Sequence, residues 1–185
     1  MCHEMHSMGD SCIKQPTRRK LRYAGRMLQR DYPTQYCPVA GSLEVVGERW
    51  TLLIIRESFY GATRFEQFHR VLQCARNLLS ERLALLVDEG ILERSGYREP
   101  GSRTRAEYRL TDKGRELAYV LFALQQWGDR HKADPEGPPV LARHAECGCE
   151  LHVTFACAEG HIVHELDEIE LVDGPGALPP VPGLR

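Results

Sequence analysis

The sequence predicts a mainly α-helical domain with one small β-hairpin, followed by a small β-rich appendage toward the C-terminus. Three observations support this expectation. Four apolar segments with helical spacing come before two strand-like segments, which a turn-rich loop joins. A long amphipathic helix follows them. The Pro- and Gly-rich stretch KADPEGPP then separates this domain from the rest of the chain.

Composition limits the class of protein. The chain has 185 residues, of which 42% are hydrophobic, enough for one buried core and a smaller appendage. No stretch approaches the roughly 18 apolar residues that a membrane helix needs, and the N-terminal sequence MCHEMHSMGD is polar. Seven cysteines, an odd number scattered along the chain, argue against a secreted disulfide framework. We therefore expect a cytoplasmic protein with no membrane partner.

Charge is distributed unevenly along the chain. Residues 1–36 contain seven Lys or Arg against three Asp or Glu, whereas residues 133–185 contain two against ten. The basic leader fits either an arm that lies along a phosphate backbone or a flexible, solvated segment. The acidic end would be repelled by polyanions, so the two ends are expected to meet different partners.

Two helices open the predicted domain. Pro38 suits a first helical position and Gly47 a helix end, which predicts a short amphipathic helix over residues 38–46. The nearly apolar residues 49–59 predict a second helix that is buried on most sides.

A helix, a turn and a further helix come next. Residues 65–72 have an apolar face, and the stretch ARNLLSERLALLVDEGILER has leucines at helical spacing, with Gly90 at the expected helix end. The apolar stripe of this fourth helix consists of Leu79, Leu83, Leu86 and Val87. The opposite side carries Asn77, Ser80, Glu81, Ala84 and Asp88. The stripe is expected to hold the helix to the core while the polar side faces outward.

The segments ILERSGYRE and RAEYRLT flank the loop PGSRT and predict a β-hairpin with a basic tip. Thr111 is expected to cap one long helix that extends to about residue 132. The apolar stripe of that helix is wider than one hairpin and four short helices can cover. Part of the stripe is therefore expected to face a second subunit.

Helix, turn, helix and basic hairpin together form the winged helix-turn-helix arrangement. The major groove of DNA admits one α-helix, whose first residues reach base edges while its rear face packs on a core. Arginine pairs with guanine and asparagine with adenine, and arginines on the hairpin suit phosphates or the minor groove. Each such side chain alone could equally be a solvated surface residue; the ordered series of elements is the specific signal. The predicted partner is double-stranded DNA, with these contact residues: Arg64, Arg76, Asn77, Ser80, Arg82, Arg98, Arg103 and Arg105.

Residues 37–132 resemble the HxlR-type winged-helix transcription regulators of bacteria and archaea, relatives of the MarR group. The resemblance rests on CPVAGSLEVVGERWTLLIIR, on TRFEQFHRVLQCARNLLSERLALLVDEGILER, and on EYRLTDKGREL followed by LQQWGDRH. It implies a homodimer held through the first and last helices, a roughly two-fold operator, and Arg64, Asn77, Ser80 and the wing arginines at the DNA. The wing, YREPGSRTRAEY, lacks the paired prolines that are usual in the family.

Cys37 directly precedes Pro38 at a predicted helix start. The positive end of the helix dipole favours the reactive thiolate form of a cysteine placed there. The resemblance implies that a cysteine at this position can sense oxidants or electrophiles. The alternative is a small, half-buried residue that belongs to the fold.

The appendage, expected over residues 140–173, contains thiol and imidazole groups that suit tetrahedral Zn²⁺: His144, Cys147, Cys149, Cys157 and His161. The resemblance to relatives with longer C-terminal extensions implies a zinc-ribbon-like module. Its second knuckle is altered here, since the spacing H-x2-C-x-C followed by C-x3-H lacks the paired C-x2-C knuckles of a clear zinc ribbon. Zinc, a disulfide and reduced thiols all stay open at this point. Residues 133–139 are expected to be a linker and residues 174–185 a disordered tail.

Sequence motifs of enzymes are missing: there is no Gly-rich phosphate loop, nucleophile elbow or H-E-x-x-H helix. The predicted function is therefore that of a non-enzymatic, DNA-binding transcriptional regulator, a homodimer whose activity could respond to thiol oxidation, electrophiles or metal. Two alternatives are an acidic-tailed adaptor for other proteins and a zinc or thiol redox module without specific DNA binding. The effector and the target genes do not follow from the sequence.

Overall fold

The computed structural model describes residues 22–23, 37–97, 105–132, 134–172 and 174–176. The chain divides into two compact units, Tyr32–Val153 and a second one formed by Met1–Asp31 with Thr154–Arg185, and each is described by itself. No helix among the described residues is long and apolar enough to cross a membrane.

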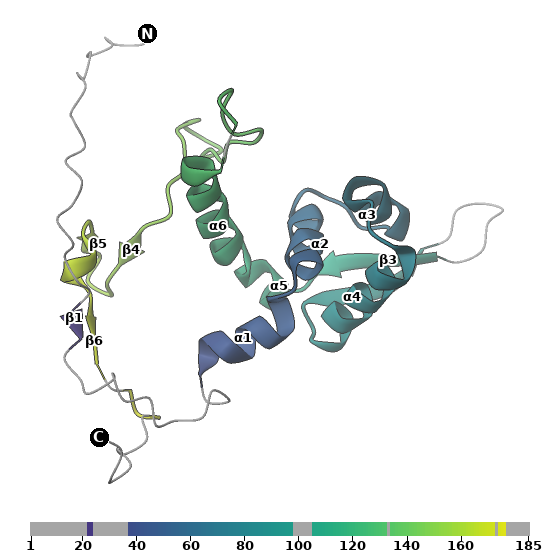
Figure 1. The fold of residues 1–185 in the computed structure, drawn as a ribbon, viewed down its shortest axis with the longest axis horizontal. Helices are drawn as coiled ribbons and strands as arrows, with labels where there is room; N and C mark the ends of the chain where they lie inside the picture. Colours follow the sequence, from purple (N-terminus) through teal and green to yellow (C-terminus); the bar gives the residue numbers. More distant parts are fainter. Residues whose placement is uncertain (1–21, 24–36, 98–104, 133, 173, 177–185) are drawn as a thin grey trace. The chain divides into compact units, whose positions relative to one another are not determined.

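The larger unit begins with α1 (Pro38–Val46) and α2 (Arg49–Phe59), both with the predicted bounds. Pro38 is the first residue of α1, as its fixed φ angle and missing N–H favour. Helix α2 is the central element of this unit, since it contacts helices α1, α3, α4 and α6 as well as strand β3 of the hairpin (Figure 1). Ile54 and Ile55 of α2 have no exposed surface.

Helices α3 (Phe65–Leu72) and α4 (Arg76–Asp88) form the helix-turn-helix. Gln73 follows α3 in the left-handed conformation, with φ of 50°, and Cys74 is buried in the turn. Gly90 has φ of 66° just after α4, so the predicted glycine stop is confirmed. Both helices pack against α2 and against each other.

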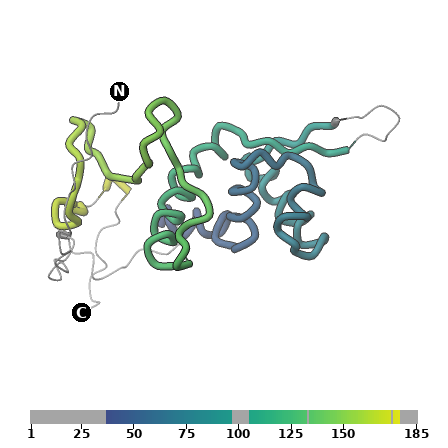
Figure 2. Tube along the Cα trace, turned by 90° about the horizontal axis from the view of Figure 1, so that it is seen from above, coloured from purple at the N-terminus to yellow at the C-terminus, as the bar shows by residue number. Residues whose placement is uncertain are grey.

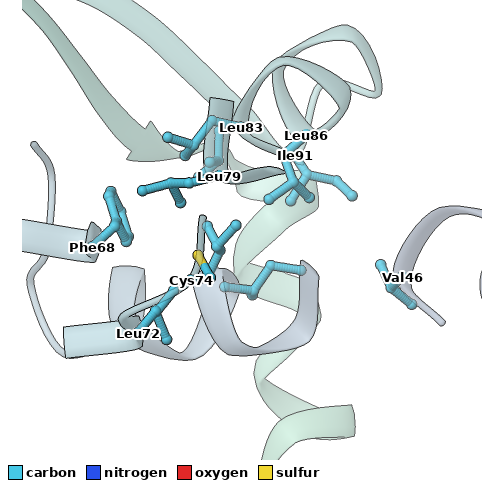
Figure 3. Packing of buried hydrophobic residues seen from close by; sticks show 11 residues of the cluster. Val46, Phe68, Leu72, Cys74, Leu79, Leu83, Leu86 and Ile91 are labelled. Atoms are coloured by element: carbon cyan, nitrogen blue, oxygen red, sulfur yellow. The ribbon is translucent and has the colours of Figure 1, made fainter. Parts of the chain in front are cut away.

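The core fixes α4 by its rear face. Figure 3 shows Phe68 of α3 beside Leu79 and Leu83 of α4. The side chains of Leu79, Leu83 and Leu86 have no exposed surface, and Val87 packs at the edge of the cluster. Burial of one such leucine contributes roughly 1.5–3 kcal/mol. The predicted apolar stripe is confirmed, and it leaves the other side of α4 free to face outward.

The hairpin consists of β2 (Leu92–Tyr97) and β3 (Arg105–Leu110), which pair antiparallel over their full length. Figure 2 shows the two strands side by side, extended beyond the helices. A backbone bridge also joins Arg64 to Glu107, so the residue before α3 pairs with β3. The hairpin is thereby anchored to the helix-turn-helix, and the winged helix-turn-helix fold is confirmed.

The predicted long helix is in fact two helices, α5 (Asp112–Glu116) and α6 (Ala118–His131). Thr111 caps α5 as predicted, since its hydroxyl accepts a hydrogen bond from the Gly114 N–H over 3.1 Å. A Cβ on Gly114 would lie 2.2 Å from the carbonyl oxygen of Ile91, so α5 lies directly on the turn after α4. Helix α6 instead packs against α2. The two helices meet different parts of the domain, which requires the break between them.

Much of the apolar surface of α1 and α6 is exposed. No residue of α6 is fully buried. The exposed apolar side chains on the two helices are Val39, Leu43, Tyr119, Val120, Phe122, Leu124 and Trp127. We call these seven residues the α1–α6 face. The uncovered stripe expected from the sequence is therefore present in the structure.

Residues 140–153 are tethered to α6. The side-chain amide of Gln125 donates to the carbonyl oxygen of Val140 over 3.0 Å, and the N–H of Val153 donates to Oε1 of Gln126 over 2.6 Å. The larger compact unit consequently runs to Val153, beyond the linker expected at residues 133–139.

Among its described residues, the smaller unit contains short elements: β1 (Arg22–Tyr23), β4 (Phe155–Ala156), β5 (Ile162–Val163), the 3₁₀ turn η2 (Leu166–Glu168) and β6 (Glu170–Leu171). Strands β4 and β5 pair antiparallel, and β1 pairs parallel with β6. The basic leader thus supplies one strand. The remainder of the leader and residues 177–185 of the expected tail lie outside the described residues.

Candidate nucleic-acid interface

Helix α4 presents two different surfaces. Leu79, Leu83 and Leu86 hold it in the core, whereas Arg76, Asn77 and Ser80 in its first two turns are exposed. Because a helix turns about 100° per residue, Asn77 lies about 200° and Ser80 about 100° around the helix from Leu79, away from its buried side. The sequence prediction of an anchoring side and an outer side therefore agrees with the burial of these residues.

Arg76, the first residue of α4, is engaged by α3. Its guanidinium forms an ion pair with the Glu66 carboxylate and lies over the ring of Phe65, with 5.0 Å between the guanidinium carbon and the ring centroid. The hydrogen bond from Arg76 lowers the pKa of Glu66, and the same bond raises the pKa of Arg76. Both side chains are largely exposed, so the pair orients Arg76 at the surface without removing it from solvent.

Glu66 and Glu107 are two acidic residues that the sequence analysis missed. The positive charge of Arg105 also acts on Glu66. Glu107 on β3 accepts a hydrogen bond from Arg109 over 3.1 Å, and its pKa is lowered mainly by a side-chain hydrogen bond from Thr63, then by Arg109 and Arg64. Glu66 meets Arg76 only when α3 and α4 pack together, and Glu107 meets Thr63 only when β3 lies beside the start of α3, so these two contacts have no local sequence signal. Glu107 and Arg109, in contrast, are two residues apart on one strand.

Arg64 stands at the junction of α3 and β3. It is the residue before α3, and its backbone N–H donates to Oε1 of Gln67 over 2.8 Å. The N–H of Thr63 donates to the same oxygen over 2.9 Å. Gln67 therefore closes the start of α3 in the manner of a capping box, and this fixes the backbone that carries Arg64.

Arg82 lies on another side of α4 from the outer residues. It follows Ser80 by two positions, or about 200° around the helix. Its side chain is only 26% exposed, and Nη2 lies 3.9 Å from Oε2 of Glu48, the residue before α2. These contacts suit a link between α4 and α2 better than the DNA contact expected from the sequence.

Of the three wing arginines, Arg105 is described. It is the first residue of β3 and is exposed. Arg98 and Arg103 lie outside the described residues. We use the name α3–α4 surface for seven residues, of which Glu66, Arg76, Asn77, Ser80 and Arg105 are exposed and Arg64 and Glu107 are partly buried.

Cys37 is the residue before α1, as expected, and its thiol is half-buried. Its backbone carbonyl oxygen accepts from the N–H of Gly41 over 3.0 Å, which belongs to the first turn of α1. The cysteine is thus fixed at the start of a helix on which Val39 and Leu43 are exposed.

The five proposed metal ligands are divided between the two units. His144, Cys147 and Cys149 belong to the larger unit, and Cys157 and His161 belong to the smaller one. In the smaller unit, Sγ of Cys157 lies 3.5 Å from Nδ1 of His161. Over the described part of the chain, no group of three or more His, Cys, Asp or Glu side chains is arranged to hold a metal ion. The predicted zinc-ribbon character of the appendage is not confirmed.

Comparison with known proteins gives the family. The profile of the HxlR-like helix-turn-helix family matches residues 45–136. The HTH-type transcriptional regulator Mb3122 of Mycobacterium bovis is 43% identical over 138 residues, which cover 75% of this chain and 85% of the relative.

Two crystal structures of proposed transcription factors are also similar. PA1607 is 35% identical, with a TM-score of 0.63, and the match covers 71% of this chain and 92% of that protein. PA1374 from Pseudomonas aeruginosa is 38% identical, with a TM-score of 0.54, and the match covers 77% of this chain and 95% of that protein. The matches extend over the helix-turn-helix, the hairpin and the helices that flank them. The chain belongs to the HxlR-like helix-turn-helix family.

Proposed function

We propose that this HTH-type regulator binds DNA sequence-specifically as a homodimer and contacts base edges with the first two turns of α4. The observation that carries the proposal is the division of α4 into a rear face with fully buried leucines and an outer side with Asn77 and Ser80 exposed. A recognition helix needs both, because the groove contacts position the helix only if the domain behind it is rigid.

The chemistry of the outer residues suits a groove. The amide of Asn77 can pair with an adenine edge, and the hydroxyl of Ser80 can donate or accept. Arg76, already oriented by Glu66, stands where a phosphate or a guanine could replace the carboxylate. Arg105 and the arginines of the wing loop supply positive charge beside the helix, which favours phosphate contact.

The α1–α6 face supports the homodimer. Large exposed apolar surfaces mark interaction sites, and the seven side chains of this face lie on two helices that both pack against α2. A two-fold dimer would place two copies of α4 in successive major grooves, roughly 34 Å apart. The operator would then have approximate two-fold symmetry.

Replacing Asn77 with alanine is expected to reduce the difference in binding free energy between operator and random duplex by about 1–3 kcal/mol. The affinity for random duplex should stay nearly unchanged. Footprinting on the promoter region of the protein's own gene would locate the operator. Titrations of that operator and of random duplex at the same moderate salt concentration would measure the two affinities. Asp88→Ala serves as the control, because Asp88 is exposed in the last turn of the same helix. If the unaltered protein showed no preference for any promoter region, the proposed specific regulator would be excluded.

Replacing Glu66 with glutamine is expected to strengthen binding to random duplex and to make it more dependent on salt. The change removes a negative charge from the α3–α4 surface and releases Arg76 for a phosphate, which would steepen the log–log salt slope by about 0.9. Titrations between low and moderate salt give the slope. Glu116→Gln on α5 is the matched control, and an unchanged slope for Glu66→Gln would contradict the expected role of the pair.

A response to oxidants through Cys37 stays a proposal. It is supported by the position of this half-buried thiol at the start of α1, one of the two helices of the α1–α6 face. Footprinting repeated with peroxide, for the unaltered protein and for Cys37→Ser, tests it. The same assay with a zinc chelator tests dependence on metal.

A further inference from the structure

A short turn in residues 144–149 brings two exposed thiols together. Cys147 and Cys149 are separated by Gly148 alone, and both carry free, exposed thiols. The N–H of His144 donates to the carbonyl oxygen of Cys149, and the N–H of Gly148 donates to the carbonyl oxygen of His144, each over 2.8 Å. These two bonds close the turn on itself, so the cysteines lie at the end of a small backbone loop.

Gly148 allows the backbone to turn sharply between the two cysteines. Its φ angle is 71°, in the left-handed region that residues with a Cβ rarely adopt. On either side of the turn, Arg143 and Glu150 form an antiparallel backbone bridge. The N–H of Cys147 also points toward Nδ1 of His144, over 3.4 Å. Backbone hydrogen bonds and the conformation of Gly148 therefore hold the two cysteines in one tight turn.

The two cysteines also contact each other directly. The Cys149 thiol donates a hydrogen bond to the carbonyl oxygen of Cys147, with Sγ 3.9 Å from that oxygen. Both thiols are exposed and free. An accessible cysteine with a second, resolving cysteine beside it is the arrangement in which oxidants act reversibly. The Cys149 thiol is thus placed to act on an oxidised Cys147.

We propose that Cys147 and Cys149 are a redox-active dithiol, which a hydroperoxide oxidises to an intramolecular disulfide. The sulfur of Cys147 attacks the terminal peroxide oxygen, the O–O bond breaks, and the leaving oxygen takes a proton to give water, or an alcohol from an organic peroxide. Cys147 is then a sulfenic acid. The Cys149 sulfur attacks the sulfenic sulfur, the S–O bond breaks, and water leaves with the Cys149 proton. Two thiols lose two electrons, and the peroxide gains them.

The product would be easy to reduce again. A disulfide across one intervening residue closes a small ring, and strained or exposed disulfides have the more oxidising reduction potentials. Reversible use therefore suits this pair better than permanent cross-linking. The chemistry belongs to the turn itself, so it does not depend on whether the chain binds DNA.

Mass spectrometry of the full-length protein tests the proposal. The protein is treated with a chelator, reduced, desalted, exposed to hydrogen peroxide at equimolar concentration, alkylated and cleaved at glutamate. Cleavage after Glu146 and Glu150 separates the pair from Cys157. The expected product is a peptide that holds both cysteines, carries no alkyl group and is lighter by two hydrogen atoms than the reduced peptide.

Single variants assign the two roles. In Cys149→Ser, Cys147 should stop at the sulfenic acid, which dimedone labels, and the internal disulfide should be lost. Cys147→Ser should lose it as well. Cys157→Ser, which removes an exposed thiol from the other turn, should leave the disulfide unchanged. Full alkylation of both cysteines after peroxide, or a main product in which Cys147 is joined to Cys157 or to another chain, would overturn the proposal.

Discussion

Replacing Leu79 with alanine is expected to lower the free energy of unfolding by about 2–5 kcal/mol. Leu79 has no exposed surface and packs beside Phe68 in the cluster that joins α2, α3 and α4 (Figure 3). The loss comprises the transfer free energy of the removed carbons and the cost of the cavity left behind. Because whole domains are commonly stable by only about 5–15 kcal/mol, this one change would remove a large share of the total.

Urea unfolding followed by circular dichroism measures the effect. Ser80→Ala is the matched control, since Ser80 is the next residue of α4 and is exposed. Exposed substitutions of this kind change stability by no more than about 0.5 kcal/mol. A loss of stability in Ser80→Ala as large as that in Leu79→Ala would mean that α4 does not have the two distinct sides described above.

Glutamate at two positions of the α1–α6 face is expected to separate the dimer and to weaken operator binding by about 10²–10⁴-fold. Leu43 of α1 is 58% exposed and Tyr119 of α6 is 78% exposed. In the proposed dimer both become buried, and the double variant Leu43→Glu/Tyr119→Glu would place unpaired charges there. A monomer engages one half-site at a time, so the gain from simultaneous binding is lost.

Sedimentation velocity gives the oligomeric state, and a titration on the footprinted operator gives the affinity. Leu166→Glu is the control, because Leu166 is 60% exposed and lies in η2 of the smaller unit. Thermal unfolding of the double variant checks that it is folded. A folded double variant that sediments like the unaltered protein would show that another surface joins the subunits.

The helices and the hairpin could be predicted from the sequence because their signals are local. The spacing of Leu79, Leu83 and Leu86 encodes one buried side directly, and Pro38 and Gly90 act on the backbone where they stand. The same reasoning missed the break between α5 and α6. That break follows from the close approach of Gly114 to Ile91, two residues that are remote in sequence, and no periodicity reports such a contact.

In the candidate site, too, local features could be predicted from the sequence and contacts between distant residues could not. Exposure of Asn77 and Ser80 follows from the helical period, so it could be predicted. The partners of arginines could not, because they depend on how elements pack: Glu48 beside Arg82, and Glu66 beside Arg76. For the Cys and His residues of the appendage, spacing suggested a zinc site that stays a prediction. No group of three or more metal-binding side chains is found among the described residues.

The pairing of arginines with glutamates on the α3–α4 surface has a consequence for how such a regulator finds its operator. A genome offers about 10⁶–10⁹ competing sites to a DNA-binding protein. Glu66 pairs with Arg76 when no DNA is bound. In the proposed complex, a duplex would have to displace this carboxylate to gain the Arg76 contact. The ion pair would thus shorten each visit to unrelated DNA and leave more of the protein free to search.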